Sequence, residues 1–149
     1  MPFEGESFDL VVAYLSLIDI PDAKQAIAEM NRVLRPGGHL LIANLTSFFS
    51  ASNPGGWRNG PDGTSYFVLD RYMGERSDWI GWGELRVLNW HRPLSTYMQL
   101  LLGTGLELRH FDEPMPHGGD PEQLHQCRRV PPFVLMDWQK PAPDAATAG

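Results

Sequence analysis

Apolar residues run without alternation near the start of the chain. From Phe8 to Leu15 both side-chain parities are apolar, and Asp9 is the exception. This pattern is typical of a strand whose sheet is covered on both faces, and such strands normally lie inside the sheet. The chain opens with this strand, so we expect that its neighbour on one side is not encoded here.

A helical period follows the strand. Asp19-Ile20-Pro21-Asp22 favours a helix start, and the apolar positions then recur every three to four residues at Ala23, Ile27, Met30 and Leu34. We predict an amphipathic helix over residues 22–34, ended by Pro36-Gly37-Gly38. The apolar run over residues 39–44 then predicts a second strand, parallel to the first.

Residues 45–92 have a different character, with many glycines, prolines and aromatic residues. Strand-forming composition over 65–73 and 84–90, around the turn-rich segment 74–83, predicts one antiparallel hairpin. Because connections of this length are usually functional, we expect the segment to cover a site.

The last third returns to regular elements. The pattern predicts a helix beginning near Pro93, with Ser95 as its N-cap and Leu94, Met98, Leu101 and Leu102 on one face. Strands are predicted over 106–112 and 132–138, with a short helix over 122–128 between them. The sequence therefore predicts an α/β fold with a mixed sheet: one domain over 1–139, an aromatic cover over 45–92, and a disordered tail over 140–149.

Length and charge narrow the range of partners. The 149 residues suit one domain, and the net charge of −6 provides no basic face for nucleic acid. No apolar run approaches the roughly 20 residues that span a bilayer, and the acidic amino terminus does not resemble a signal peptide. We expect a soluble, cytoplasmic protein with neither nucleic acid nor membrane as a partner.

Two groups of residues have side chains that could bind a metal or catalyse hydrolysis, but neither has the spacing that is characteristic of such a site. Four residues near the end fit no zinc-binding spacing, and Cys127 is the only cysteine, so no metal site is expected: His117, Asp120, His125 and Cys127. Ser16, Asp19 and His91 could form a hydrolytic triad, but no Gly-x-Ser-x-Gly turn presents the serine. Hydrolysis stays a distant alternative.

Two motifs at characteristic spacing resemble class I S-adenosylmethionine-dependent methyltransferases. Phe3-Glu4-Gly5-Glu6-Ser7-Phe8-Asp9 resembles the lead into the fourth strand of that family, and Leu34-Arg35-Pro36-Gly37-Gly38 is similar to the turn before its fifth strand. Arg92-Pro93, Glu113-Pro114 and the closing Pro-Phe strand are similar to the family's carboxy-terminal third. The resemblance implies a partial Rossmann-like methyltransferase sheet, from strand four onward.

The resemblance also implies a cofactor, S-adenosylmethionine. The family holds it chiefly through a glycine-rich turn after the first strand and an acidic residue closing the second. Neither motif is present, and no Gly-x-Gly-x-Gly occurs in the sequence. We therefore expect a methyltransferase-like protein that acts on a small molecule and is incomplete as a single chain.

Ligands bind in open α/β sheets outside the carboxyl ends of the strands, so Tyr14-Leu15-Ser16 after the first strand and Asn44-Leu45-Thr46 after the second should face any site. By resemblance, Tyr14, Leu15 and Ser16 would line the cofactor's methyl side. The expected substrate pocket comprises six residues: Asn44, Thr46, Trp57, Trp82, Trp90 and His91. His91 is a weak candidate for a general base. Alternatively, the aromatic residues only stabilise the hairpin.

The sequence leaves two candidate functions and one expected kind of partner. The chain is either a methyltransferase, completed by another chain or by a longer protein, or a non-catalytic module that assembles and binds through its aromatic cover. The bare edge of strand 8–15 should recruit another strand. We expect a homodimer, or a partner chain, joined through that edge.

Overall fold

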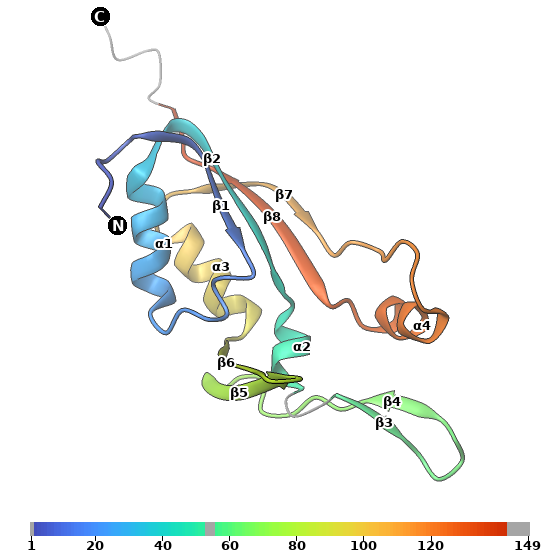
Figure 1. Cartoon of the computed structure of the whole chain (residues 1–149). Helices are drawn as coiled ribbons and strands as arrows, with labels where there is room; N and C mark the ends of the chain where they lie inside the picture. The colour runs from blue at the N-terminus through green and yellow to red at the C-terminus, as the bar shows by residue number, and fades with distance from the viewer. Residues whose placement is uncertain (1, 53–55, 143–149) are drawn as a thin grey trace, which may run out of the picture.

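The computed structural model describes residues 2–52 and 56–142, apart from the side chain of Trp82. Within these residues the centre of the fold is a four-stranded sheet in the order β1-β2-β8-β7 (Figure 1). Its strands are Phe8–Tyr14 (β1), Leu34–Leu45 (β2), Phe133–Gln139 (β8) and Glu107–Asp112 (β7). β1 and β2 are parallel, whereas β8 runs antiparallel to both β2 and β7. The predicted α/β class and mixed sheet are confirmed.

Helix α1 (Ala23–Val33) connects the two parallel strands and agrees with the prediction to within one residue at each end. Its N-cap is Asp22, whose side chain accepts a hydrogen bond from the backbone N–H of Gln25 at 2.8 Å. Helix α3 (Leu94–Leu102) begins after Pro93, not at the predicted N-cap Ser95, and no side chain caps it. Its buried residues are Tyr97 and Leu101, whereas Leu102 is 57% exposed, so the predicted apolar face is partly wrong.

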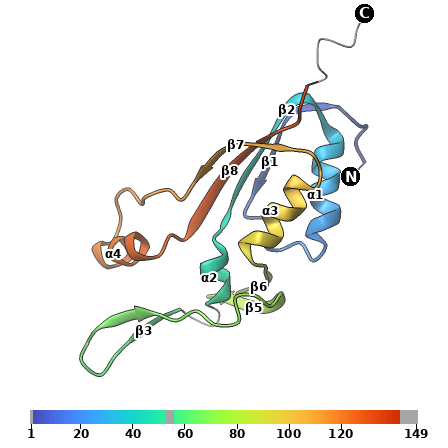
Figure 2. The same ribbon diagram turned by 180° about the vertical axis from the view of Figure 1, so that it is seen from behind.

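The hydrophobic core lies between one face of the sheet and these two helices. Figures 1 and 2 show α1 and α3 together on the same side of the sheet. Alternate residues of β2 and β8 enter this layer, and Trp138, Leu40 and Ile27 are fully buried in it. Every second residue of these strands faces the core layer, as the two-residue period of a strand requires.

The other face of the sheet is uncovered by the described residues. On β1, Leu10, Val12 and Tyr14 are 50%, 59% and 70% exposed. The sequence pattern predicted a strand covered on both faces, with a bare edge on one side. Within the described residues β1 is an edge strand, in agreement with the prediction, but only one of its faces is covered, since α1 and α3 both lie on the other side.

The segment 45–92 contains two hairpins, not the one that was predicted. β3 (Trp57–Asn59) pairs with β4 (Ser65–Phe67), and β5 (Arg76–Trp82) pairs with β6 (Leu85–His91). Most of the segment predicted as a turn is therefore the strand β5. The turn itself has two residues, and Gly83 at its first position has a φ of 61°, which is the conformation that glycine adopts without strain.

Two short helices complete the described chain. α2 (Ser47–Ala51) follows β2 directly and was not predicted, while α4 (Pro121–Arg129) confirms the predicted short helix. Lys140, the first residue of the predicted tail, is held in place, because its Nζ donates to the carbonyl oxygens of Asn31 and Leu34. The rest of that prediction, from residue 143 onward, lies outside the described residues.

Candidate functional site

A hollow of about 280 Å³ lies at the end of the sheet where both parallel strands finish. Leu15 follows β1 and Leu45 ends β2, so the two meet at this edge. Phe133 begins the antiparallel strand β8 at the same edge, and β6 closes the opposite wall. The lining residues are Leu15, Ile18, Asp19, Leu45, Val87, Asn89 and Phe133. This is the place where open α/β sheets bind their ligands.

The walls of the hollow are apolar, with one polar pair. Asn89 is 4% exposed, and its Nδ2 donates to a carboxylate oxygen of Asp19 at 2.5 Å. The backbone N–H of Asp19 also donates to the carbonyl oxygen of Ser16, which fixes the turn. No described residue donates a hydrogen bond to the second carboxylate oxygen of Asp19. An exposed carboxylate acceptor therefore stands at the rim of an otherwise apolar hollow.

Arg92 holds the loop that carries Asp19. It is 3% exposed, and its guanidinium donates to the carbonyl oxygens of Leu17, Ile20 and Pro21 at 3.1, 2.8 and 2.6 Å. The backbone N–H of Trp90 donates to the carbonyl oxygen of Ile18 in the same loop. The end of β6 and the residue that follows it thus bind the loop after β1, and the rigid fork of an arginine suits several acceptors at once.

His91 lies behind the hollow, not in it. Its side chain is 1% exposed, and its Nε2 lies 2.8 Å from the carbonyl oxygen of Tyr72. A carbonyl oxygen can only accept, so Nε2 carries the proton, and Nδ1 accepts from the hydroxyl of Ser50 at 2.8 Å. Burial lowers the pKa of His91, which favours this neutral form. Both ring nitrogens of His91 are therefore engaged within the fold, and this geometry gives no support to its predicted role as a general base.

Of the three residues predicted on the cofactor side, Leu15 lines the hollow. It has a φ of 47°, a left-handed conformation that is unusual for leucine, and its N–H donates to the carbonyl oxygen of Ala43. Tyr14 extends onto the uncovered sheet face, where it is 70% exposed. Ser16 contributes its carbonyl oxygen to the turn at Asp19.

The two polar residues predicted for the substrate pocket are both buried, and of these only Thr46 has a clear role in the fold. Thr46 is 3% exposed, caps α2, and donates its hydroxyl to the carbonyl oxygen of Pro131 at 2.8 Å. Asn44 is also 3% exposed, and no described group bonds its Oδ1. Neither residue lines the hollow.

The predicted tryptophans are likewise not part of the hollow. Trp57 packs edge-on against Phe67 and lies under the guanidinium of Arg129, 4.8 Å from the ring centre. The ring of Trp90 stacks with Arg92 at 5.5 Å. The side chain of Trp82 lies outside the described residues. For Trp57 and Trp90 the alternative interpretation, in which the aromatic residues stabilise the hairpins, fits these contacts.

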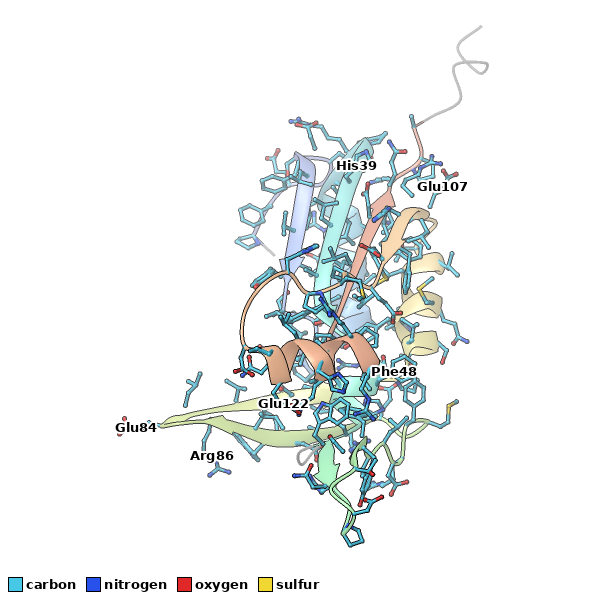
Figure 3. The ribbon with its side chains drawn as sticks, turned by 90° about the vertical axis from the view of Figure 1, so that its right-hand side faces the viewer. His39, Phe48, Glu84, Arg86, Glu107 and Glu122 are labelled. Atoms are coloured by element: carbon cyan, nitrogen blue, oxygen red, sulfur yellow. The ribbon has the colours of Figure 1, made fainter. Side chains whose placement is uncertain are left out.

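Sequence reasoning missed most of the residues that line the hollow. It placed Leu15 and Leu45 at the strand ends that face the site, and it named Asp19 only as part of a triad, but it did not name four others: Ile18, Val87, Asn89 and Phe133. Figure 3 places Glu84 and Arg86 at the outer end of the β5–β6 hairpin, away from Phe48 on α2. The inner part of β6 forms the wall through Val87 and Asn89, and the sequence of this strand has no regular apolar and polar alternation that could have shown it.

The two weaker sequence clusters form no site. Asp19 is bonded to Asn89, and the ring nitrogens of His91 are bonded to Ser50 and Tyr72, so the hydrolytic triad with Ser16 is not assembled. Asp120 caps α4 by accepting from the N–H groups of Glu122 and Gln123. The described residues contain no group of three or more potential metal ligands, and none of their helices is long and apolar enough to cross a membrane.

Comparisons with known proteins agree with this topology. A family model described as "Methyltransferase domain" matches residues 1–42, from the lead into β1 to the middle of β2. The methyltransferase GfsG of Streptomyces halstedii is 49% identical over 45 residues, which are 30% of this chain and 16% of that protein. The ubiquinone/menaquinone biosynthesis C-methyltransferase UbiE of Hahella chejuensis is 44% identical over 54 residues, 36% of this chain and 20% of the relative.

Similar solved structures extend the likeness to nearly the whole chain. A protein of Listeria monocytogenes assigned as an S-adenosylmethionine-dependent methyltransferase superposes with a TM-score of 0.85 at 22% identity, over 94% of this chain and 64% of that one. An S-adenosylmethionine-dependent methyltransferase of Mesorhizobium loti gives 0.81 at 25% identity, over 93% and 65%. The chain thus spans slightly less than two thirds of these structures. It has the fold of these S-adenosylmethionine-dependent methyltransferases.

Proposed function

We propose that this chain forms the acceptor side of a site that transfers a methyl group from S-adenosylmethionine to a small molecule. The observation that carries the proposal is the apolar hollow of about 280 Å³ at the carboxyl ends of β1 and β2. Ligand sites of open α/β sheets lie at this edge, and a concave, mostly apolar lining with few polar groups is typical of small-molecule pockets. The methyltransferases that the chain resembles support the reaction class.

The lining favours a small, largely apolar acceptor with one hydroxyl or amino group. Leu15, Val87 and Phe133 provide apolar walls, and Asp19 provides a carboxylate oxygen that can accept a hydrogen bond at the rim. The similar demethylmenaquinone methyltransferase of Staphylococcus aureus, 53% identical over 41 residues, carries the name of an acceptor of this apolar kind. That likeness covers 28% of this chain and supports the class of acceptor only.

The residues of the hollow would act by orientation. S-adenosylmethionine, when bound, supplies an electrophilic methyl group, and transfer to an acceptor needs chiefly proximity and alignment. Asp19 is positioned for this role, because Asn89 binds one of its oxygens and Arg92 holds the loop on which it lies. The other oxygen would bind the acceptor's hydroxyl or amino hydrogen and set the direction of its lone pair.

The described residues do not fit the whole cofactor. The amino-acid part of S-adenosylmethionine carries a carboxylate, but no lysine or arginine lines the hollow. The one carboxylate in the lining, that of Asp19, already binds Asn89. The glycine-rich turn that the family uses is not in the sequence. We therefore propose that another chain, or another part of a longer protein, completes the site.

Binding of a model acceptor tests this proposal. 1-Naphthol is apolar, carries one hydroxyl group and can be titrated by calorimetry. We expect saturable binding that Val87→Lys weakens at least about tenfold, because the charge would enter an apolar wall. Leu85→Lys is the matched control: Leu85 lies two residues away on β6, is 59% exposed and does not line the hollow. Equal affinities for the two variants, or no binding of 1-naphthol at millimolar concentration, would refute the proposed acceptor site.

A non-catalytic assembly module is the second candidate. The observation that favours it is the exposure of Leu10, Val12 and Tyr14 on one sheet face, together with a hollow that lacks a group for the cofactor's carboxylate. Titration of the purified chain with S-adenosylmethionine separates the two candidates. No heat at millimolar cofactor would exclude autonomous catalysis, and if 1-naphthol also failed to bind, the assembly module would be favoured.

A further inference from the structure

Charged side chains line another cavity, of about 290 Å³, where the β3–β4 hairpin meets β5 beyond the end of α2 (Figures 1 and 2). We call it the arginine pocket, and its charged lining residues are Arg58, Asp70, Arg71, Arg76 and Asp78. The whole lining falls between residues 51 and 78 and shares no residue with the hollow at the strand ends. The arginine pocket is therefore a separate site from the proposed acceptor site.

Arg76 is the least exposed of the three arginines and is fixed by the fold. Its side chain is 12% exposed, and its Nε donates to a carboxylate oxygen of Asp78 at 3.1 Å. Its two terminal nitrogens donate to the carbonyl oxygens of Arg71 and Ala51, at 3.1 and 2.9 Å. A guanidinium has five N–H groups, and no described residue accepts the remaining two. Arg76 thus retains one donor on each terminal nitrogen.

Arg71 supplies a positive charge that no described carboxylate neutralises. Its side chain is exposed and forms no hydrogen bond or ion pair with a described residue. Its φ is 54°, a left-handed conformation that costs energy for a residue with a Cβ atom. The carbonyl oxygen of Arg71 accepts from the N–H of Gly74 and from Arg76, and these bonds hold it in place. The backbone therefore fixes the position of this charge beside Arg76.

The two aspartates of the lining are already bonded. Asp78 accepts from Arg76, and Asp70 accepts from the backbone N–H of Arg71 at 2.7 Å. Three positive and two negative side chains leave the lining with a net charge of +1. One positive charge matches a single carboxylate better than a phosphate group, which carries about −1.5 to −2 at neutral pH. The guanidinium fork also fits the two oxygens of a carboxylate.

We propose that the arginine pocket binds the carboxylate of a small molecule. Arg71 and the two remaining N–H groups of Arg76 would bind its oxygens, and Arg58 adds positive charge from β3. Val68 offers an apolar contact to the rest of the molecule, and about 290 Å³ is near the lower end of ligand-pocket volumes. A bound carboxylate would join β3 to β5 and hold the two hairpins together. The inference does not rest on the proposed methyl-transfer function.

A titration with benzoate tests the arginine pocket, with the backbone amide resonances of the labelled chain as the readout. At constant ionic strength we expect saturable shifts at Ser52, Val68 and Asp70, with a dissociation constant of about 1–10 mM. Benzyl alcohol has the same ring without the charge and should leave these three resonances unshifted. Equal shifts with the alcohol, or no saturable shift at these residues, would overturn the proposal. Benzoate shifts confined to Leu15 and Val87 would do the same, because they would place benzoate in the hollow.

Replacement of Arg71 measures its part in binding. Arg71→Met removes charge-assisted hydrogen bonds to the carboxylate, so the affinity for benzoate should fall at least about tenfold. Arg86→Met is the matched control, because it causes the same change in net charge at an exposed residue that does not line the arginine pocket. Its affinity should stay within about twofold of the wild type, since salt screens distant charges. Equal losses in both variants would contradict the role of Arg71.

Asp70→Asn gives a test that a folding defect cannot imitate. Asparagine keeps an oxygen that can accept from the N–H of Arg71, while three positive side chains now face one negative, a net charge of +2. Benzoate binding should tighten about two- to tenfold, and more at low ionic strength. Unchanged or weaker binding would overturn the proposal. Inorganic phosphate at equal ionic strength should bind less tightly than benzoate, and tighter binding of phosphate would contradict the assignment of a carboxylate.

Discussion

Replacement of Arg92 by methionine tests how the loop beside the candidate site is held. The side chain of Arg92 is 3% exposed and donates to the carbonyl oxygens of Leu17, Ile20 and Pro21. Methionine fills a similar volume and packs in irregular spaces, so the change removes the hydrogen bonds with little loss of packing. The loop should loosen while the sheet stays intact.

The loss in the free energy of unfolding depends on which of these carbonyl groups can bind water once Arg92 is replaced. Leu17 is 1% exposed, so its carbonyl would be left buried without a donor, which costs about 1–3 kcal/mol. Ile20 is half-buried and Pro21 exposed, so their carbonyls can bind water, and each lost bond costs about 0.5–1.5 kcal/mol. The free energy of unfolding should fall by about 2–6 kcal/mol, a large part of the roughly 5–15 kcal/mol that is typical of a domain.

Urea unfolding followed by tryptophan fluorescence measures this loss, and hydrogen exchange locates it. We expect the midpoint to fall by about 1–3 M urea, and the amides of Asp19 and Trp90 to exchange faster, because both donate hydrogen bonds within or to this loop. Arg86→Met is the control, because Arg86 is exposed on β6, which ends just before Arg92, and its loss should cost less than about 0.5 kcal/mol. Equal losses for Arg92→Met and Arg86→Met, or unchanged exchange at Asp19, would refute the role of Arg92.

Three further predictions concern other elements. Burial lowers the pKa of His91, so the unfolded chain binds a proton at this histidine more readily than the folded chain does. The contribution of His91 to the free energy of unfolding should therefore be complete above about pH 6.5 and fall below it, by at most about 1.4 kcal/mol per pH unit. Urea titrations at several pH values should show a smaller loss for His91→Gln. A Cβ on Gly38 would lie 2.9 Å from the carbonyl oxygen of Arg35, so Gly38→Ala should lower the melting temperature, whereas Gly74→Ala, with its nearest atom at 3.7 Å, should not. Asp22→Ala should cost about 1 kcal/mol of stability through loss of the α1 cap, and Asp22→Ser should restore most of it; equal melting temperatures for these two variants would contradict the capping role.

The sequence predicted those elements whose local pattern and tertiary environment agree. The apolar period from Ala23 to Met30 coincides with the buried face of α1, and Asp22 caps the helix as its residue type suggests. The strands β2 and β8 were found because each has continuous or alternating apolar residues next to proline or glycine, although β2 begins at Leu34, before the predicted start at residue 39, and includes Pro36-Gly37-Gly38. The order of the elements, and the family likeness of the fold, followed from these patterns.

The hairpins and the lining of the hollow depend on contacts between distant segments. Gly74, Gly81 and Gly83 made β5 read as a turn, but its pairing with β6 outweighs the low strand propensity of glycine. Asn89 and Asp19 are 70 residues apart, and no local pattern shows that they meet. His91 and the tryptophans have residue types common in active sites, yet burial and contacts show that His91, Trp57 and Trp90 stabilise the fold.

The location of a bound model acceptor tests the central claim most directly. Within the described residues a second apolar hollow, of about 310 Å³ between Val12, Leu41 and Leu135, lies on the uncovered sheet face and offers 1-naphthol an alternative place to bind. We propose to follow the backbone amide resonances of the labelled chain during a titration with 1-naphthol. Saturable shifts at Leu15, Ile18 and Val87, reduced by Asp19→Asn, are the result that an acceptor site at the strand ends predicts. Shifts confined to Val12, Leu41 and Leu135 would contradict it.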